Sequence, residues 1–281
     1  DLAGAVTYPL DDAAGFRADV ERVAAATGHE PVAFGCMDEW VLALAETRPA
    51  GVRLPFAPGT VAGVLDKERL YAAAARLDVP HPETYRLDGV GDRSGVAGAE
   101  DGASPPLVAP EAAVERLGFP LVAKPARKRE FEELVGTNVV VVEDADEFDD
   151  VVAVARDADV RLMAQEHVDA VPGEDRSFAS YRPLAAADGG AGAEAGTGPA
   201  AGAAATAGVD DADGTVGMVG NPVVRHPRGL GSSCLVDRVE SPAVAERGLA
   251  VLRDAGYRGI SEAEFVRDPA RDEDVLLDVN T

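Results

Sequence analysis

Lysine is scarce in this chain of 281 residues: of its 26 basic side chains, three are Lys and the other 23 are Arg. Acidic residues number 50, which gives a formal net charge of −24. A field of that sign repels polyanions, so it argues against nucleic acid and membrane surfaces as partners and leaves room for a local basic pocket that binds a small anion. An acidic surplus with so little Lys is typical of halophilic proteins, and we expect this protein to be halophilic.

Cysteine and long apolar runs are scarce too. The two cysteines, Cys36 and Cys234, have no CxxC or Cys/His spacing near them, which argues against a disulfide framework or a zinc site, and we expect both to be buried. No run approaches the roughly 20 apolar residues of a membrane span, and no signal segment opens the chain. We therefore expect a cytoplasmic protein whose hydrophobic residues, 46% of the total, build one large or two ordinary domains.

Apolar periodicity predicts alternating helices and strands, which is typical of an α/β or α+β enzyme. Helices are predicted over 16–26, 61–77, 110–117, 147–155 and 242–255, and strands over 31–34, 119–123, 138–142, 161–168, 177–184, 215–225, 259–266 and 275–280. Residues 126–137 are charged and are expected to form a loop. Phe34 and Trp40 are assigned to the core.

Residues 185–214 differ in kind from the rest of the chain. They comprise 13 Ala, eight Gly and five acidic residues, with no basic or aromatic side chain. Such a segment cannot bury enough apolar surface to offset the entropy lost on ordering. We expect a disordered insertion between two strands of a hairpin.

The last predicted hairpin carries oxygen donors on one face. Side chains alternate along a strand, so Glu262 and Glu264 share a face, as do Asp278 and Asn280 on the opposing strand. Glu264, Asp278 and Asn280 are hard donors of the kind that Mg²⁺ takes beside nucleotide phosphates. In an acidic protein the same pattern is also typical of a solvated strand face, and spacing alone leaves both interpretations open.

Each of the three lysines stands where an anion could bind. Lys124 ends an apolar strand and so emerges where a buried strand meets a loop, and a compact ammonium binds phosphate well. Lys128 belongs to the only run of three consecutive basic residues, 127–129, which would otherwise be a solvated turn. Lys67 follows Asp66 on the first turn of a helix, where free N–H groups and the helix dipole favour anions.

The order of these pieces resembles the ATP-grasp superfamily over about residues 58–281. The motifs are DK at 66–67, VPHP at 79–82, GFPLVAKP at 118–125, QEHV at 165–168 with PGED at 172–175, GISEAEF at 259–265 and LDVN at 277–280. The resemblance is to the branch with carboxylate–amine ligases and carbamoyl-phosphate-synthase-like domains. It implies an α+β fold of two α+β subdomains, 58–166 and 167–281, after a partial α/β pre-ATP-grasp domain at 1–57. The chain is then expected to be a fragment truncated at both ends.

The resemblance also implies roles for individual residues. ATP would be bound by Lys67, Lys124, Lys128, Gln165, Glu166, Val168, Glu174 and Asp175. Within that set the lysines would bind the phosphates, and Glu174 or Asp175 would bind the ribose. Residues 165–168 would bind the adenine: Glu166 would accept a hydrogen bond from its amino group, and the backbone of Val168 would bind the edge of the ring. Glu264, Asp278 and Asn280 would hold one or two Mg²⁺ or Mn²⁺ ions, with Asp278 standing where Glu is commoner.

Arg225 matches the basic residue that faces the γ-phosphate and the carboxylate substrate, with Ser232 and Ser233 in the adjoining loop as weaker candidates. The implied activity is an ATP-dependent ligase that activates a carboxylate as an acyl phosphate for attack by an amine or similar nucleophile. An ATP-binding regulatory or assembly module without turnover is the alternative, and the absence of GxGxxG after an early strand disfavours a Rossmann dehydrogenase. Partners would be the small-molecule carboxylate and amine, and a homodimer is an open alternative to a monomer.

Overall fold

The computed structural model describes residues 6–91, 104–126, 128–137, 139–184, 209–210, 213–226 and 232–281. The chain divides into two compact units. Unit 1 comprises Asp1–Leu65, Ser177–Ala263 and Val279–Thr281, and unit 2 comprises Asp66–Arg176 and Glu264–Asp278. No helix within the described ranges is long and apolar enough to span a membrane. Helices and two separate sheets make this an α+β structure, which confirms the expected class.

Unit 2 contains a five-stranded sheet with strand order β2-β1-β5-β3-β4. Its strands are β1 (Thr84–Leu87), β2 (Leu107–Val108), β3 (Leu121–Pro125), β4 (Val140–Val142) and β5 (Leu162–Glu166). β1 and β2 run parallel, and the other neighbours run antiparallel. In the register of β3 and β5, Lys124 stands opposite Met163.

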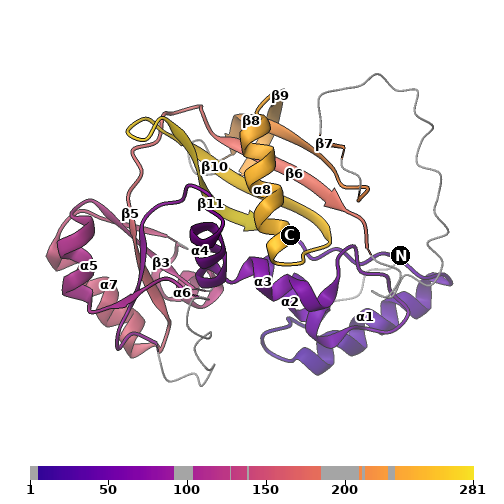
Figure 1. Cartoon of the computed structure of the whole chain (residues 1–281). Helices are drawn as coiled ribbons and strands as arrows, with labels where there is room; N and C mark the ends of the chain where they lie inside the picture. Colours follow the sequence, from indigo (N-terminus) through magenta and orange to yellow (C-terminus); the bar gives the residue numbers. More distant parts are fainter. Residues whose placement is uncertain are drawn as a thin grey trace. The chain divides into compact units, whose positions relative to one another are not determined.

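Helices α5 (Pro110–Leu117) and α7 (Ala145–Asp157) lie on one face of this sheet (Figure 1). The core on that face contains Leu121 and Ala123 of β3 together with Phe148 and Val152 of α7. Since side chains alternate along a strand, Lys124 points to the opposite face. These two helices therefore cover the hydrophobic face of the sheet, and Lys124 lies on the face that they do not cover.

The helix predicted over 61–77 is in fact two helices, α3 (Val61–Leu65) and α4 (Lys67–Arg76). Asp66 between them has an extended backbone, and its carboxylate accepts hydrogen bonds from the N–H groups of Glu68 and Arg69. This is an N-cap, which satisfies donors that the first turn of a helix leaves unpaired. The cap makes Lys67 the first residue of α4.

The charged loop expected over 126–137 is wrong, because Lys128–Val135 forms helix α6. Phe131 of this helix is fully buried, and Val135, four residues later, packs against the same core. Residues four apart share a helix face, so two apolar side chains suffice to dock the helix. The many charges of the segment hid this short apolar stripe.

The second sheet has six strands, in the order β11-β10-β6-β8-β7, with β9 paired to β8. Its strands are β6 (Arg176–Arg182), β7 (Val209–Asp210), β8 (Val216–His226), β9 (Ser232–Val239), β10 (Gly259–Asp268) and β11 (Glu273–Asn280). Helix α8 (Pro242–Asp254) covers one face of this sheet (Figure 1), and a Cβ on Gly248 would lie 2.7 Å from the ring of Phe178. Residues 185–208 and 211–212 of the expected disordered insertion lie outside the described residues, and β7 pairs with β8.

Strand β9 was not predicted, and Ser232 and Ser233 open this strand instead of lying in a loop. Most of its described side chains are exposed, so the strand shows no apolar alternation from which it could be recognised. Cys234 on this strand is exposed, as is Cys36, which makes the expectation of buried cysteines wrong for both.

The N-terminal part of unit 1 contains α1 (Ala13–Thr27), α2 (Asp38–Thr47) and the short 3-10 helix η1 (Pro58–Thr60). The rings of Phe16 and Trp40 pack edge to face with centroids 5.5 Å apart. Phe34, in contrast, is 61% exposed, and the expected buried strand over 31–34 is reduced to a single parallel bridge between Val32 and Arg53. The assignment of Phe34 to the core is therefore wrong.

Gly91 makes a close backbone approach that no other residue type allows. Gly89 and Gly91 both have a positive φ, at 68° and 73°, but a Cβ on Gly91 would lie 2.2 Å from the backbone nitrogen of Arg161, whereas a Cβ on Gly89 would meet nothing within 4 Å. We expect Gly89→Ala to lower the free energy of unfolding by about 1 kcal/mol through backbone strain and Gly91→Ala by about 3 kcal/mol or more through the added clash. Urea denaturation of both variants measures the difference, and equal losses would show that the backbone near Arg161 yields at no cost.

Candidate functional site

The candidate site is built around β11, where side chains from α4 and β3 meet two consecutive residues, Leu277 and Asp278. The phenolic hydroxyl of Tyr71 donates to the carbonyl of Leu277 at 2.7 Å. Nζ of Lys124 donates to that hydroxyl at 2.8 Å and to the same carbonyl at 3.0 Å. One residue further along β11, the ammonium of Lys67 forms an ion pair with Oδ1 of Asp278. The structure thus brings together two of the three predicted lysines, Lys67 and Lys124, and one predicted carboxylate, Asp278.

Both ammonium groups of this cluster are deeply buried. Lys67 is 2% exposed and Lys124 is 6% exposed, whereas lysines in proteins are almost never fully buried unless they are paired. Desolvating a charge costs several kcal/mol, and here an ion pair, a hydroxyl and a carbonyl offset that cost. Two buried ammonium groups thus lie at consecutive residues of β11, and one of them, that of Lys67, is paired with a carboxylate.

The position of this cluster follows from the local folding of the chain. The Asp66 cap begins α4 at Lys67, and Tyr71 stands four residues later on the same face of that helix. Lys124 lies on the face of β3 that α5 and α7 do not cover. β11 is fixed from a third side, because the N–H of Leu276 donates to the carbonyl of Pro80 at 2.8 Å.

The residues predicted to bind adenine lie at the end of β5, and their side chains are engaged with the protein. Gln165 is buried and donates through Nε2 to the hydroxyl of Thr84 at 2.8 Å. Oε2 of Glu166 accepts hydrogen bonds from the N–H of Glu83, at 3.0 Å, and from Arg271. The carbonyl of Val168 accepts a hydrogen bond from the N–H of Ala170 at 2.8 Å.

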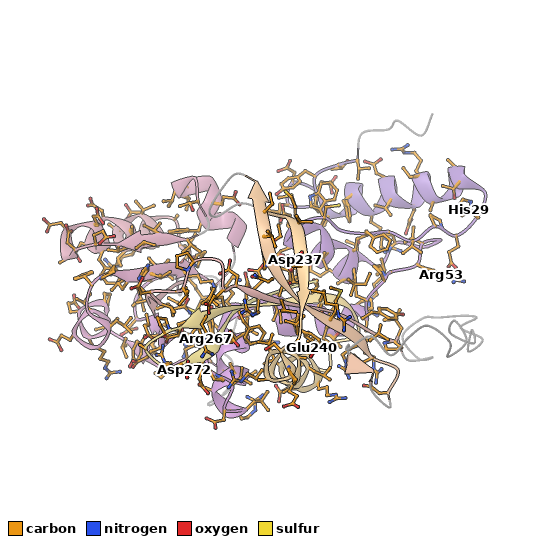
Figure 2. All side chains as sticks on the ribbon, turned by 90° about the horizontal axis from the view of Figure 1, so that it is seen from above. His29, Arg53, Asp237, Glu240, Arg267 and Asp272 are labelled. Atoms are coloured by element: carbon orange, nitrogen blue, oxygen red, sulfur yellow. The ribbon has the colours of Figure 1, made fainter. Side chains whose placement is uncertain are left out.

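Arg271 belongs to the turn between β10 and β11 and joins that turn to β5. Its guanidinium binds Glu166 and Asp268, and the hydrogen bond to Glu166 is the largest cause of a raised pKa for Arg271. Burial alone would raise the pKa of Asp268, but hydrogen bonds from Arg271 and from the N–H of Ala270 outweigh it and hold that pKa below its usual value. Arg267 and Asp272 form a second ion pair across the turn, and Figure 2 shows them side by side.

The residues predicted to bind ribose follow in the segment after β5. Glu174 is exposed, and its N–H donates to the carbonyl of Val171 at 3.1 Å. Asp175 is half-buried, and its carbonyl accepts from the guanidinium of Arg176. The N–H of Val171 donates to the carbonyl of Arg267, so the segment is held against the end of β10. Both carboxylates thus belong to the segment that connects β5 to β6.

The predicted metal ligands lie on neighbouring strands, Glu264 on β10 and both Asp278 and Asn280 on β11. All three are half-buried, and the residues that alternate with them, Phe265 and Val279 among others, are buried. No cluster of three or more His, Cys, Asp or Glu suited to a metal occurs among the described residues; the predicted set has two carboxylates and one amide. The donor chemistry is of the kind that Mg²⁺ takes. In the structure Asp278 is paired with the ammonium of Lys67.

Two predicted residues have side chains outside the described part of the structure. Lys128 is the first residue of α6, and Arg225 lies on β8 with its backbone opposite Ser233 of β9. The backbone register thus brings Arg225 beside a serine that was singled out with it. Tyr71 and Arg271 were not predicted from the sequence. The one signal for Tyr71 is its spacing of four from Lys67, which puts both residues on one face of a helix.

No protein-family model matches this sequence, and no curated protein matches it. Solved structures do share its fold. A D-alanine-D-alanine ligase from Coxiella burnetii aligns with a TM-score of 0.51 and 13% identity over 87% of this chain. The VanG D-Ala:D-Ser ligase from Enterococcus faecalis aligns with a TM-score of 0.50 and 15% identity over 85% of this chain. An N5-carboxyaminoimidazole synthase from Aspergillus clavatus, in complex with ADP and 5-aminoimidazole ribonucleotide, aligns with a TM-score of 0.51 and 12% identity over 94% of this chain.

The chain spans little more than half of each of these proteins. It covers 55% of the Coxiella enzyme, 59% of the Enterococcus enzyme and 55% of the Aspergillus enzyme. At such identities the likeness establishes the fold.

Proposed function

This chain has the ATP-grasp fold, and from that premise we propose that it is the nucleotide-binding part of an ATP-dependent ligase that joins a carboxylate to an amine or similar nucleophile. Two of the matched proteins are a D-alanine-D-alanine ligase and a D-Ala:D-Ser ligase, and the matched synthase is seen with ADP. The observation that carries the proposal is the cluster that the buried lysines Lys67 of α4 and Lys124 of β3 form with β11, where they bind Asp278 and the carbonyl of Leu277.

Phosphate binding is the task that best fits the two lysines. A buried ammonium is a compact point charge in a medium of low dielectric constant, where its attraction for a phosphate oxygen is stronger than in water. Lys67 and Lys124 come from different elements but meet at consecutive residues of β11. We assign them to the phosphates of ATP, with Lys128 as a third phosphate ligand.

The other nucleotide contacts follow from residues near the end of β5. We assign the adenine to Gln165, Glu166 and the backbone of Val168, and the ribose to Glu174 or Asp175. Because Oε2 of Glu166 already accepts two hydrogen bonds from the protein, its Oε1 or its carbonyl is the acceptor that we assign to the adenine amino group.

Glu264, Asp278 and Asn280 would hold Mg²⁺ in the working site. The ion would neutralise negative charge that builds up on the phosphates during transfer. Asp278 also binds Lys67, so this carboxylate links the metal ligands to the phosphate ligands. These side chains would act by positioning the phosphates and by their charge.

Activation of the carboxylate explains why a ligase needs ATP. A carboxylate is a poor acyl donor at neutral pH, and transfer of the γ-phosphoryl group to it gives an acyl phosphate with a good leaving group. The nucleophile then displaces phosphate, and ADP is released. In this scheme the lysines stabilise the transferred group, and Arg225 would face the carboxylate.

ADP release from the full-length protein tests the proposed function. Pools of carboxylates and amines are added with ATP and Mg²⁺, and ADP is measured with and without each pool. We expect ADP release that needs both a carboxylate and a nucleophile. ATP binding with no substrate-dependent ADP release would instead favour a regulatory or assembly module.

Lys124 gives a direct test of phosphate binding. We expect Lys124→Ala to weaken ATP binding by about tenfold or more, since it removes a buried positive charge, and Lys124→Arg to restore it only in part because a guanidinium fork cannot occupy the place of a compact ammonium. Titration calorimetry measures both. Arg116→Ala is the control, because Arg116 stacks over Tyr85 away from this cluster. Unchanged ATP affinity in Lys124→Ala would remove this lysine from the site.

A further inference from the structure

Tyr71 has a hydroxyl that closes a triangle of hydrogen bonds at the centre of the site. It accepts from Nζ of Lys124 at 2.8 Å and donates to the carbonyl of Leu277 at 2.7 Å, while the same Nζ donates to that carbonyl at 3.0 Å. Each atom of the triangle is held by the other two. The position of the Lys124 ammonium is thus set by one group on α4 and one on β11.

The ring of Tyr71 is held independently of its hydroxyl. Tyr71 is 1% exposed, its ring stacks on that of His81 with centroids 6.1 Å apart, and Nζ of Lys124 lies 5.3 Å from the ring centroid. These contacts involve ring carbons, so they survive when the oxygen atom alone is removed. A phenylalanine at this position would keep the packing and lose the triangle.

We propose that Tyr71 is a positioning residue for phosphate binding, which fixes the ammonium of Lys124 where the phosphates of the nucleotide must meet it. This inference rests on the proposed function. A lysine side chain has four rotatable bonds, and an ammonium that is held in advance loses less entropy when its ligand arrives. The hydroxyl of Tyr71 supplies that restraint without touching the nucleotide.

The proposal separates phosphate binding from general stability. We expect Tyr71→Phe to weaken ATP binding about tenfold, as a lost hydrogen bond to a charged group does, and to leave the affinity for adenosine unchanged. Both affinities are measured by titration calorimetry on the full chain. Tyr257→Phe is the matched control, because Tyr257 is equally buried and its hydroxyl also donates to a backbone carbonyl, that of Ile260, at 2.7 Å. This control should lose stability and keep its affinity for ATP.

A double-mutant cycle shows whether Tyr71 acts through Lys124. We expect Tyr71→Phe to have no further effect on ATP affinity in a Lys124→Ala background. An equal loss for ATP and adenosine, no loss for ATP, or the same loss in both backgrounds would each overturn the proposal.

The proposed function can fail separately from this inference. If Lys124→Ala weakens ATP binding and Tyr71→Phe does not, the phosphate site stands and the role of Tyr71 is wrong. If the unmodified protein binds ATP no more tightly than adenosine, the phosphate site itself is wrong, and the role of Tyr71 falls with it.

Discussion

Asp278→Asn is expected to reduce substrate-dependent ADP release by about a thousandfold or more while the protein still binds nucleotide. The substitution keeps the shape of the side chain and removes its negative charge. A charge that is needed as the γ-phosphoryl group departs contributes several kcal/mol, and each 1.4 kcal/mol is a factor of about ten in rate. ATP binding should weaken far less, and its dependence on Mg²⁺ should fall, because the assigned adenine and ribose contacts do not involve Asp278.

The ion pair with Lys67 adds a consequence that the sequence did not reveal. Clustered carboxylates alone would make Asp278→Asn harmless to folding, but Asp278 holds a buried ammonium, so we expect the variant to lose stability as well. ADP release must therefore be measured at a temperature where the variant is folded. Glu262→Gln is the control, since Glu262 is a half-buried carboxylate of β10 that binds Ser177. Turnover at the unmodified rate in Asp278→Asn would mean that the hairpin is a solvated acidic face.

The sequence predicted the elements of the site better than their mutual contacts. Lys67 and Lys124 stood out because lysine is rare here and because each has a local context, a helix start and a strand end, that can be seen in a few residues. The bond between Lys67 and Asp278 joins positions 211 apart in the chain. Nothing local specifies such a pairing, which arises when α4 and β11 meet in the folded unit.

Arg271 shows the same limit in a different way. In the sequence it is one of 23 arginines, in a turn full of charges. Arg271 is singled out only by its bond to Glu166, which lies on β5 and is far from the β10–β11 turn in the sequence. Glu166 could be predicted as a nucleotide ligand by its motif, but its existing bonds to Arg271 and Glu83 could not.

The missed elements have physical causes of their own. Among its described side chains α6 has one large buried residue, Phe131, and β9 is a strand whose described side chains are mostly exposed. Hydrophobic periodicity detects burial, so it overlooks elements that bury little. β9 is held by its pairing with β8, and the buried ring of Phe131 anchors α6.

Lys67→Met is expected to lower the free energy of unfolding by about 3 kcal/mol, and urea denaturation measures it. The side chain of Lys67 is 3% exposed and that of Asp278 is 14% exposed, so the substitution takes the ammonium away from a carboxylate that water reaches poorly. Removing one partner of a buried ion pair typically costs 3–5 kcal/mol, of which methionine recovers part by filling the space of the lysine stem. The exposed pair of Arg53 with Glu30, at 2.7 Å and with side chains 55% and 51% exposed, is the control. Arg53→Met should cost less than about 1 kcal/mol.

The double variant Lys67→Met with Asp278→Asn shows whether Lys67 and Asp278 stabilise the protein as an ion pair or independently of each other. With both charges gone, no unpartnered ion is left by the substitution, and buried ion pairs replaced on both sides are often close to neutral in stability. We therefore expect the double variant to recover most of the stability lost in Lys67→Met, while its ATP affinity stays low because the phosphate ligand is still missing. Losses that add in the double variant would show that Lys67 and Asp278 contribute to folding independently. Recovery of stability together with ATP affinity would show that the ammonium of Lys67 serves the fold alone.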